Sequence, residues 1–227
     1  MEEFPWFDVI ILISVGVLDL IFAIYLFNRY QKTASIIFFG FFALFVSLWV
    51  LSNAFGLVFE PGSSLVEYIW RTAFVSAVLL FPFLYLFVLS YPLPPFQINW
   101  RLILFALSPA IIMSVLIYST DSFIIGFANS RFGTTEFGSA YVFYTWFIIL
   151  IYILILVEMI NKVRRLDGLH KKQMQYFLYA ILIAGVIGIL FNLVLPYFFD
   201  LEVNYWIGPA SSIIWLGFML YVIRRRI

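Results

Sequence analysis

Residues 140–172 read AYVFYTWFIILIYILILVEMINKVRRLDGLHKK, and they contain the pattern that decides the fold. An apolar stretch over 140–161 is followed by a connection that holds Lys162, Arg164, Arg165, Lys171 and Lys172. A helix needs about 20 predominantly apolar residues to cross the hydrocarbon core of a bilayer. Cations directly after such a stretch are typical of the cytoplasmic side, where Lys and Arg accumulate. The stretch therefore predicts a transmembrane helix that ends at the cytoplasmic surface.

The composition extends this interpretation to the whole chain. Hydrophobic residues make up 65% and charged residues 11% of the 227 residues, whereas soluble domains average about 45–50% apolar and about 25% charged residues. The chain is therefore predicted to be an integral membrane protein. It contains no cysteine, which excludes disulfides and thiolate metal sites. The acidic start MEEFPWFD lacks the basic region of a signal peptide, so we expect the first apolar segment to be retained.

Seven apolar stretches are long enough to span a membrane. They cover residues 6–28, 34–57, 66–90, 101–118, 140–161, 173–197 and 206–223. Backbone groups in lipid must be hydrogen-bonded within the protein, and these stretches are too long for the strands of a barrel. The sequence therefore predicts an all-α membrane protein, a bundle of seven transmembrane helices that forms one domain over residues 1–227.

Lysine and arginine orient these helices. The cations that follow the first, third, fifth and seventh stretches are Arg29, Lys32, Arg101, Lys162, Arg164, Arg165, Lys171, Lys172 and Arg224–Arg226. The other side holds mainly acids, namely Glu2, Glu3, Glu60, Glu67, Asp121, Glu136, Asp200 and Glu202, with Arg131 as its loop cation. Because cations remain cytoplasmic, we expect the N-terminus outside the cell and the C-terminus inside.

Ionisable side chains inside a predicted span are costly, which makes them candidates for function. Asp19 lies past the middle of the first span. It is either a proton or ion site or a carboxyl group that fixes helix packing. The sequence has no second carboxylate or cation at a matching depth, which favours the packing role. Glu158 precedes Lys162 by four residues, a helical spacing that favours an ion pair at the membrane interface.

A cluster of polar and aromatic residues is predicted toward the outer ends of the helices. Arg71 lies just inside the outer end of the third span. In a closed bundle it would converge with Trp49, Asn53, Tyr144, Asn192, Ser211 and Ser212. A few polar groups among aromatic rings are typical of a small-ligand pocket, and the guanidinium of Arg71 would suit a carboxylate. Alternatively, Arg71 extends to the lipid headgroups and the aromatic residues form an interfacial belt.

Residue types exclude several kinds of chemistry. His170 is the only histidine, predicted to be a solvated residue of the fifth connection, so a multi-histidine metal site cannot form. All four lysines lie outside the predicted spans, which excludes a retinal Schiff base in the seventh helix. The sequence has no Gly-rich phosphate loop. We therefore expect no enzyme active site, no metal and no cofactor.

Four segments together resemble those of a known family. They are FPFLYLFVLSYP (81–92), FNLVLPYF (191–198), IGPASSIIW (207–215) and YVIRRRI (221–227). In order and spacing they resemble the seven-helix N-terminal sensor region of bacterial and archaeal histidine kinases, over essentially the whole chain. The resemblance implies a membrane sensor whose seventh helix continues into a cytoplasmic signalling module.

The resemblance also suggests which positions carry the output. Tyr221 to Arg224 match the end of the family's seventh helix, and the pair Gly208 and Pro209 is expected to act as a fixed turn at its start. No signalling module follows within this sequence. The chain is therefore expected to be the sensor part of a longer receptor, with a stand-alone homologue as the alternative.

The function expected from these features is that of a sensor in the cell membrane. Its ligand is an unknown small-molecule or lipid-like compound, and its partners are the bilayer and a second copy of the chain, with no role for nucleic acid. The alternative is a small transporter or channel that uses Asp19. Transporters tend to show internal repeats and broken helices near the midplane, and the sequence displays neither.

Overall fold

The computed structural model describes residues 6–28, 33–59, 63–92, 99–126, 136–195 and 207–217. Its long helices are α1 (Trp6–Phe27), α2 (Ala34–Val58), α3 (Ser64–Ser90), α4 (Trp100–Ser119), α5 (Tyr141–Arg165) and α6 (Gly168–Ile189). The π-helical segment η1 (Leu190–Val194) continues α6, and α8 (Ile207–Ala210) is the first turn of an apolar helix over Ile207–Gly217, called helix seven below. Two short antiparallel strands, β1 (Ile124–Gly126) and β2 (Glu136–Phe137), lie between α4 and α5.

Six helices in the described part of the chain are long and apolar enough to cross a membrane. They are α1 to α5, together with α6 and its continuation η1. Helix seven is apolar but shorter within the described residues. The helical membrane fold predicted from the sequence is therefore confirmed. The ends predicted for spans six and seven, at 197 and 223, lie outside the described residues.

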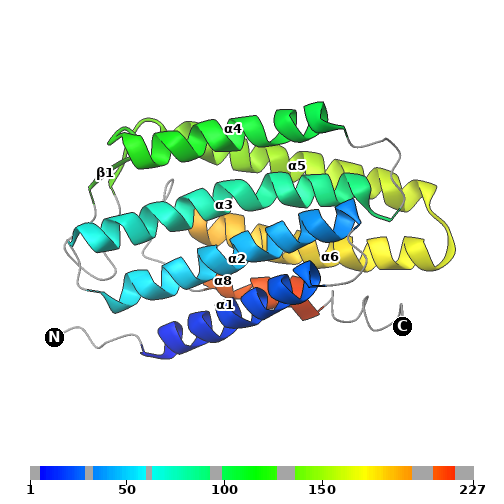
Figure 1. The fold of residues 1–227 in the computed structure, drawn as a ribbon, viewed down its shortest axis with the longest axis horizontal. Coiled ribbons are helices and arrows are strands. Elements are labelled where there is room, and N and C mark those ends of the chain that lie inside the picture. The colour runs from blue at the N-terminus through cyan, green and yellow to red at the C-terminus, as the bar shows by residue number, and fades with distance from the viewer. Residues whose placement is uncertain are drawn as a thin grey trace.

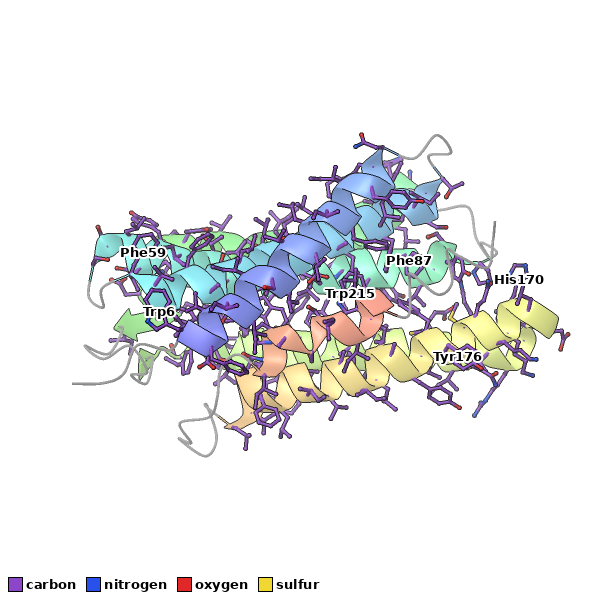
Figure 2. The ribbon with its side chains drawn as sticks, turned by 90° about the horizontal axis from the view of Figure 1, so that it is seen from below. Trp6, Phe59, Phe87, His170, Tyr176 and Trp215 are labelled. Carbon is purple, nitrogen blue, oxygen red and sulfur yellow. The ribbon has the colours of Figure 1, made fainter. Side chains whose placement is uncertain are left out.

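The connection between α5 and α6 differs from the prediction. The sequence placed it over 162–172, whereas α5 continues to Arg165 and α6 begins at Gly168. Gly168 has a φ of 60°, a left-handed conformation that glycine adopts without steric cost. This allows a connection of only two residues, Leu166 and Asp167. His170 is consequently an exposed residue of the first turn of α6 and not a loop residue (Figure 2).

Consecutive long helices run in opposite directions, as Figure 1 shows. The end of the bundle at which α1, α3 and α5 begin is called the first end below, and the opposite end is called the second end. The α2 helix packs along both α1 and α3, and α3 also contacts α4 and α5. Helix seven lies among α1, α2 and α6, so its start contacts helices from both halves of the chain.

Aromatic rings from four helices fill the centre of the bundle. Phe39 of α2 lies 4.6 Å from Phe87 of α3, 6.1 Å from Phe177 of α6 and 5.6 Å from Trp215 of helix seven, measured between ring centroids. The contacts of Phe39 with Phe177 and Trp215 are edge-to-face, a geometry that stabilises aromatic clusters beyond the area that they bury. Figure 2 shows Phe87 and Trp215 among the side chains between the helices. Trp215 therefore anchors helix seven on Phe39 of α2, which in turn packs against α3 and α6.

Candidate functional site

A buried hydrogen bond joins α1 to helix seven. The Ser212 hydroxyl donates to Oδ2 of Asp19 over 2.9 Å, and both side chains are buried. The other carboxyl oxygen, Oδ1, has no hydrogen-bond partner among the described residues. One turn earlier in α1, the Gly16 carbonyl accepts a hydrogen bond from the Ser47 hydroxyl of α2 over 2.8 Å. Polar contacts therefore hold α1 to both of its neighbours in the apolar interior.

Helix seven also packs closely against the end of α6. Asn192 lies in η1 and donates from Nδ2 to the Gly188 carbonyl over 3.2 Å. A Cβ atom added at Gly208 would lie 1.4 Å from that Nδ2 atom, so any larger residue at this position would force the Asn192 side chain to move. The Ser211 hydroxyl donates to the Ala184 carbonyl of α6 over 3.2 Å. Helix seven therefore begins in direct contact with a π-helical segment, a type of distortion that is frequent at functional sites.

The α2 helix completes this region. Asn53 donates from Nδ2 to the Trp49 carbonyl over 2.7 Å. A Cβ atom built at Gly188 would lie 3.8 Å from Cη2 of Trp49, in ordinary van der Waals contact. We call the residues that these contacts connect, with Asn53 beside Trp49, the helix-seven cluster: Asp19, Trp49, Asn53, Gly188, Asn192, Gly208, Ser211 and Ser212. It offers hydroxyl, carboxamide and carboxyl groups beside an indole ring, and it contains no cation.

Arg71 contacts a different part of the bundle. Its Nε donates to Oε1 of Glu67 over 2.9 Å, and its Nη1 donates to the carbonyl groups of Ile117 and Thr120. Asp121 lies 3.5 Å from its Nη2. The side chain is only 4% exposed. A guanidinium among the last carbonyls of α4 satisfies groups that a helix end leaves unpaired and complements the helix dipole.

Tyr144, the other candidate outside the helix-seven cluster, also lies near Arg71's helix α3. Its ring centroid is 5.7 Å from Phe74 of α3, 5.2 Å from Phe123 and 5.3 Å from Tyr141. This aromatic group forms a second, smaller core beneath β1. The structure does not bring all the predicted candidates together. Asn192, Ser211 and Ser212 lie in contacts at the start of helix seven, and Asn53 contacts the Trp49 carbonyl of its own helix. Arg71 contacts the end of α4, and Tyr144 lies in the smaller core, which also includes Leu193 of η1.

Lys162 was predicted to pair with Glu158, but among the described residues its hydrogen-bond partners are backbone carbonyls at the end of α3. The Lys162 side chain is buried, and its Nζ donates to the carbonyl of Val88, to that of Leu89 over 2.9 Å and to that of Tyr91 over 2.8 Å. The lysine turns toward α3 because the last carbonyls of that helix lack partners of their own. The helical spacing in the sequence gave no indication of this contact between α5 and α3.

The remaining candidates concern output. Gly208 and Pro209 lie inside the first turn of helix seven and not in a turn before it. Pro209 suits this place because a residue in the first turn has no helical acceptor for its N–H. Tyr221 and Arg224 lie outside the described residues, as does Arg131. Among the residues described, no group of His, Asp or Glu side chains could hold a metal ion.

Comparison with known protein families identifies the family of the chain. The model of the family described as the N-terminal 7TM region of histidine kinase matches residues 11–226, nearly the whole chain. The match includes every member of the helix-seven cluster as well as Arg71 and Tyr144. No curated protein matches the chain.

Proposed function

The chain belongs to the family of N-terminal 7TM regions of histidine kinases, and from this premise we propose how a multi-pass membrane sensor of this kind works. The chain detects an extracytoplasmic or membrane-borne ligand and transmits the signal through helix seven. The receiver is a cytoplasmic, histidine-kinase-like output module. The protein is located in the plasma membrane, with the first end of the bundle outside the cell and the second end inside.

The observation that carries this proposal is the hydrogen bond between Ser212 and Asp19. A hydrogen-bonded polar pair in an apolar interior stabilises the fold, and breaking it leaves buried polar groups unpaired at a large cost in free energy. A displacement of helix seven relative to α1 changes the state of this pair. Two bundle states that differ there respond to any ligand that binds them with different affinity.

The helix-seven cluster is the proposed ligand site. Its Asn53, Asn192 and Ser211 side chains come from three helices, and neutral donors and acceptors of this kind suit an uncharged polar or lipid-like ligand. The guanidinium of Arg71 is already engaged by Glu67, Asp121 and two carbonyls. This arrangement supports a structural role for Arg71 and not the binding of a carboxylate.

One observation favours a second candidate function. Oδ1 of Asp19 has no hydrogen-bond partner among the described residues, and buried carboxylates in membrane proteins often mark ion or proton pathways. A transporter would move an ion through Asp19 without any output module. Purified protein in proteoliposomes, with Asp19→Asn as the comparison, separates the two functions: flux that requires Asp19 supports transport and contradicts the sensor proposal.

The sensor proposal is tested with a histidine-kinase catalytic module fused after Ile227. Basal autophosphorylation in lipid nanodiscs is measured for wild type, Asp19→Asn, Ser212→Ala and the double variant. Each single change should alter the rate, and the pair should be non-additive by ~1 kcal/mol, about fivefold, because the two side chains share one hydrogen bond.

Ser114→Ala is the matched control for these variants. Its hydroxyl bonds only to the Ala110 carbonyl of its own helix, so its loss should leave autophosphorylation unchanged. If the Asp19 and Ser212 variants behave like this control, or if their effects simply add, the proposed route through helix seven is wrong.

A further inference from the structure

The face of α5 that points away from the bundle ends in a cation. Leu150, Leu154 and Val157 are between 49% and 55% exposed, and they lie on one side of the helix. Arg164 is also exposed and follows Leu150 by fourteen residues, or about four turns, so it lies on the same face. The apolar part of this face is bordered by lipid in a membrane protein. Arg164 therefore lies where that lipid ends.

The outward face of α6 has the same pattern in the opposite chain direction. Tyr176, Tyr179, Ile183 and Val186 are between 49% and 56% exposed. The exposed Lys172 precedes Tyr176 by four residues and Val186 by fourteen, again on one face. Tyrosines are enriched at the boundary between hydrocarbon and headgroups. Figure 2 shows Tyr176 on the side of α6 away from α1 and α2, with His170 beyond it.

The two cations lie at one corner of the second end. The α5–α6 connection has only two residues, and in Figure 1 this pair of helices extends past the second end of α2, α3 and α4. Lys162 pins α5 to the last carbonyls of α3, which leaves Arg164 on the outward side. No ion pair engages Arg164 or Lys172 within the part of the chain that the structure describes.

Between residues 150 and 190 the sequence contains two carboxylates, Glu158 and Asp167. The connections 29–32 and 93–98 and the final residues 218–227 contain no acidic residue. A cluster of cations with so few counter-charges, placed directly above lipid-facing stripes, is attracted to anionic headgroups of the adjacent leaflet.

We propose that Arg164 and Lys172 form a binding site for the phosphate group of anionic phospholipids at the α5–α6 corner. The acyl chains lie along the apolar stripes of the two helices, and the tyrosines of α6 lie at the level of the glycerol region. This proposal goes beyond the signalling route through helix seven and does not depend on it. It requires only that the second end adjoins a leaflet that contains anionic lipid.

The flanking cations provide a matched control. Arg165 and Lys171 carry the same charges at the same corner, and each is turned by about 100° around its helix from its neighbour Arg164 or Lys172. The variant R164Q/K172Q therefore removes the proposed site, and R165Q/K171Q removes the same net charge beside it. All four positions are exposed or partly exposed, so neither variant disturbs the core.

The experiment measures lipid binding by the detergent-solubilised chain through its thermal unfolding. Phosphatidylglycerol, phosphatidylcholine and inorganic phosphate are titrated separately. Wild type should be stabilised by phosphatidylglycerol only. R164Q/K172Q should bind it roughly 30-fold more weakly, the effect expected of two cations at an anionic membrane surface. R165Q/K171Q should lose less than about threefold in affinity for phosphatidylglycerol. Without lipid, both variants should unfold at the same temperature as wild type.

Three results overturn the proposal. Equal losses in the two variants mean that diffuse charge, and not the stripe, attracts the lipid. Stabilisation by inorganic phosphate alone means that the site binds a free anion. If phosphatidylglycerol and phosphatidylcholine stabilise wild type equally, the basic corner serves another partner, such as an acidic protein surface.

Discussion

Gly208 is the residue at which one additional carbon atom would change the contact between helix seven and η1. The Asn192 carboxamide occupies the space where its Cβ atom would lie. The neighbouring hydroxyl groups of Ser211 and Ser212 bond to α6 and to α1 respectively. Gly208, Ser211 and Ser212 thus each hold helix seven through a close contact or a hydrogen bond. The position of helix seven is therefore sensitive to small changes at these residues.

Gly208→Ala should destabilise the chain by about 1–3 kcal/mol, because overpacking forces neighbouring groups to shift. Thermal unfolding in detergent measures the effect. Gly217→Ala, in the same helix, is the control, since no atom of the described residues lies within 4 Å of the Cβ atom that it would add. Combining Gly208→Ala with Asn192→Ala should restore most of the loss. A Gly208→Ala chain as stable as the Gly217→Ala chain would contradict the close contact.

For single residues, the sequence predicted how deep each one lies in its span but not which neighbouring helix its side chain faces. The sequence predicted an outer cluster because hydropathy shows how deep a residue lies in its span; its members were Arg71, Trp49, Asn53, Tyr144, Asn192, Ser211 and Ser212. Which neighbour a side chain faces depends on how each helix is rotated and packed. Arg71 therefore turned out to contact the end of α4, and Tyr144 packs against Phe74 and Phe123.

Two helix ends in the bundle are completed by cations from neighbouring helices. Arg71 of α3 donates to the last carbonyls of α4 near the first end, and Lys162 of α5 donates to those of α3 near the second end. Each contact joins the C-terminal end of one helix to a side chain of a helix that packs against it. In the structure these cations tie neighbouring helices together, and for Arg71 we propose this role in place of ligand binding.

Lys162→Met should therefore be strongly destabilising. The carbonyls of Val88, Leu89 and Tyr91 lose a charged donor, at a cost of about 1.5–3 kcal/mol, although the apolar replacement fills a similar volume. Lys172→Met, at an exposed position of α6, should cost less than about 0.5 kcal/mol. Unfolding in a zwitterionic detergent measures both. Similar values for the two variants would mean that Lys162 does not tie α5 to α3.

The helix boundaries show what sequence patterns can predict for whole elements. Predicted spans one to four agree with α1 to α4 within two residues at each end. Side-chain caps mark several starts, as at Thr33, Ser63 and Asn99. The prediction failed at α5 and α6 because a hydropathy span stops at the first charges, whereas helical hydrogen bonding continues beyond the membrane to Arg165 and resumes at Gly168.

The charge distribution of the whole molecule predicts its orientation. The chain has no cysteine, so single cysteines can be introduced without further changes. Ser64→Cys at the first end should react with a membrane-impermeant thiol reagent in intact cells, because cations accumulate on the opposite side. Leu169→Cys, exposed at the second end, should react only after permeabilisation. Labelling in the reverse order would invert the proposed orientation.

The central claim is that helix seven carries the signal, and its rotational phase provides the most direct test. A kinase module fused after Ile227 is assayed for autophosphorylation with one, two, three or seven residues inserted after Ile223. Each inserted helical residue rotates the module by about 100°, and seven residues make nearly two full turns. The account predicts that output changes with one, two and three residues and returns toward wild type with seven. Equal output from every insertion would contradict transmission through helix seven.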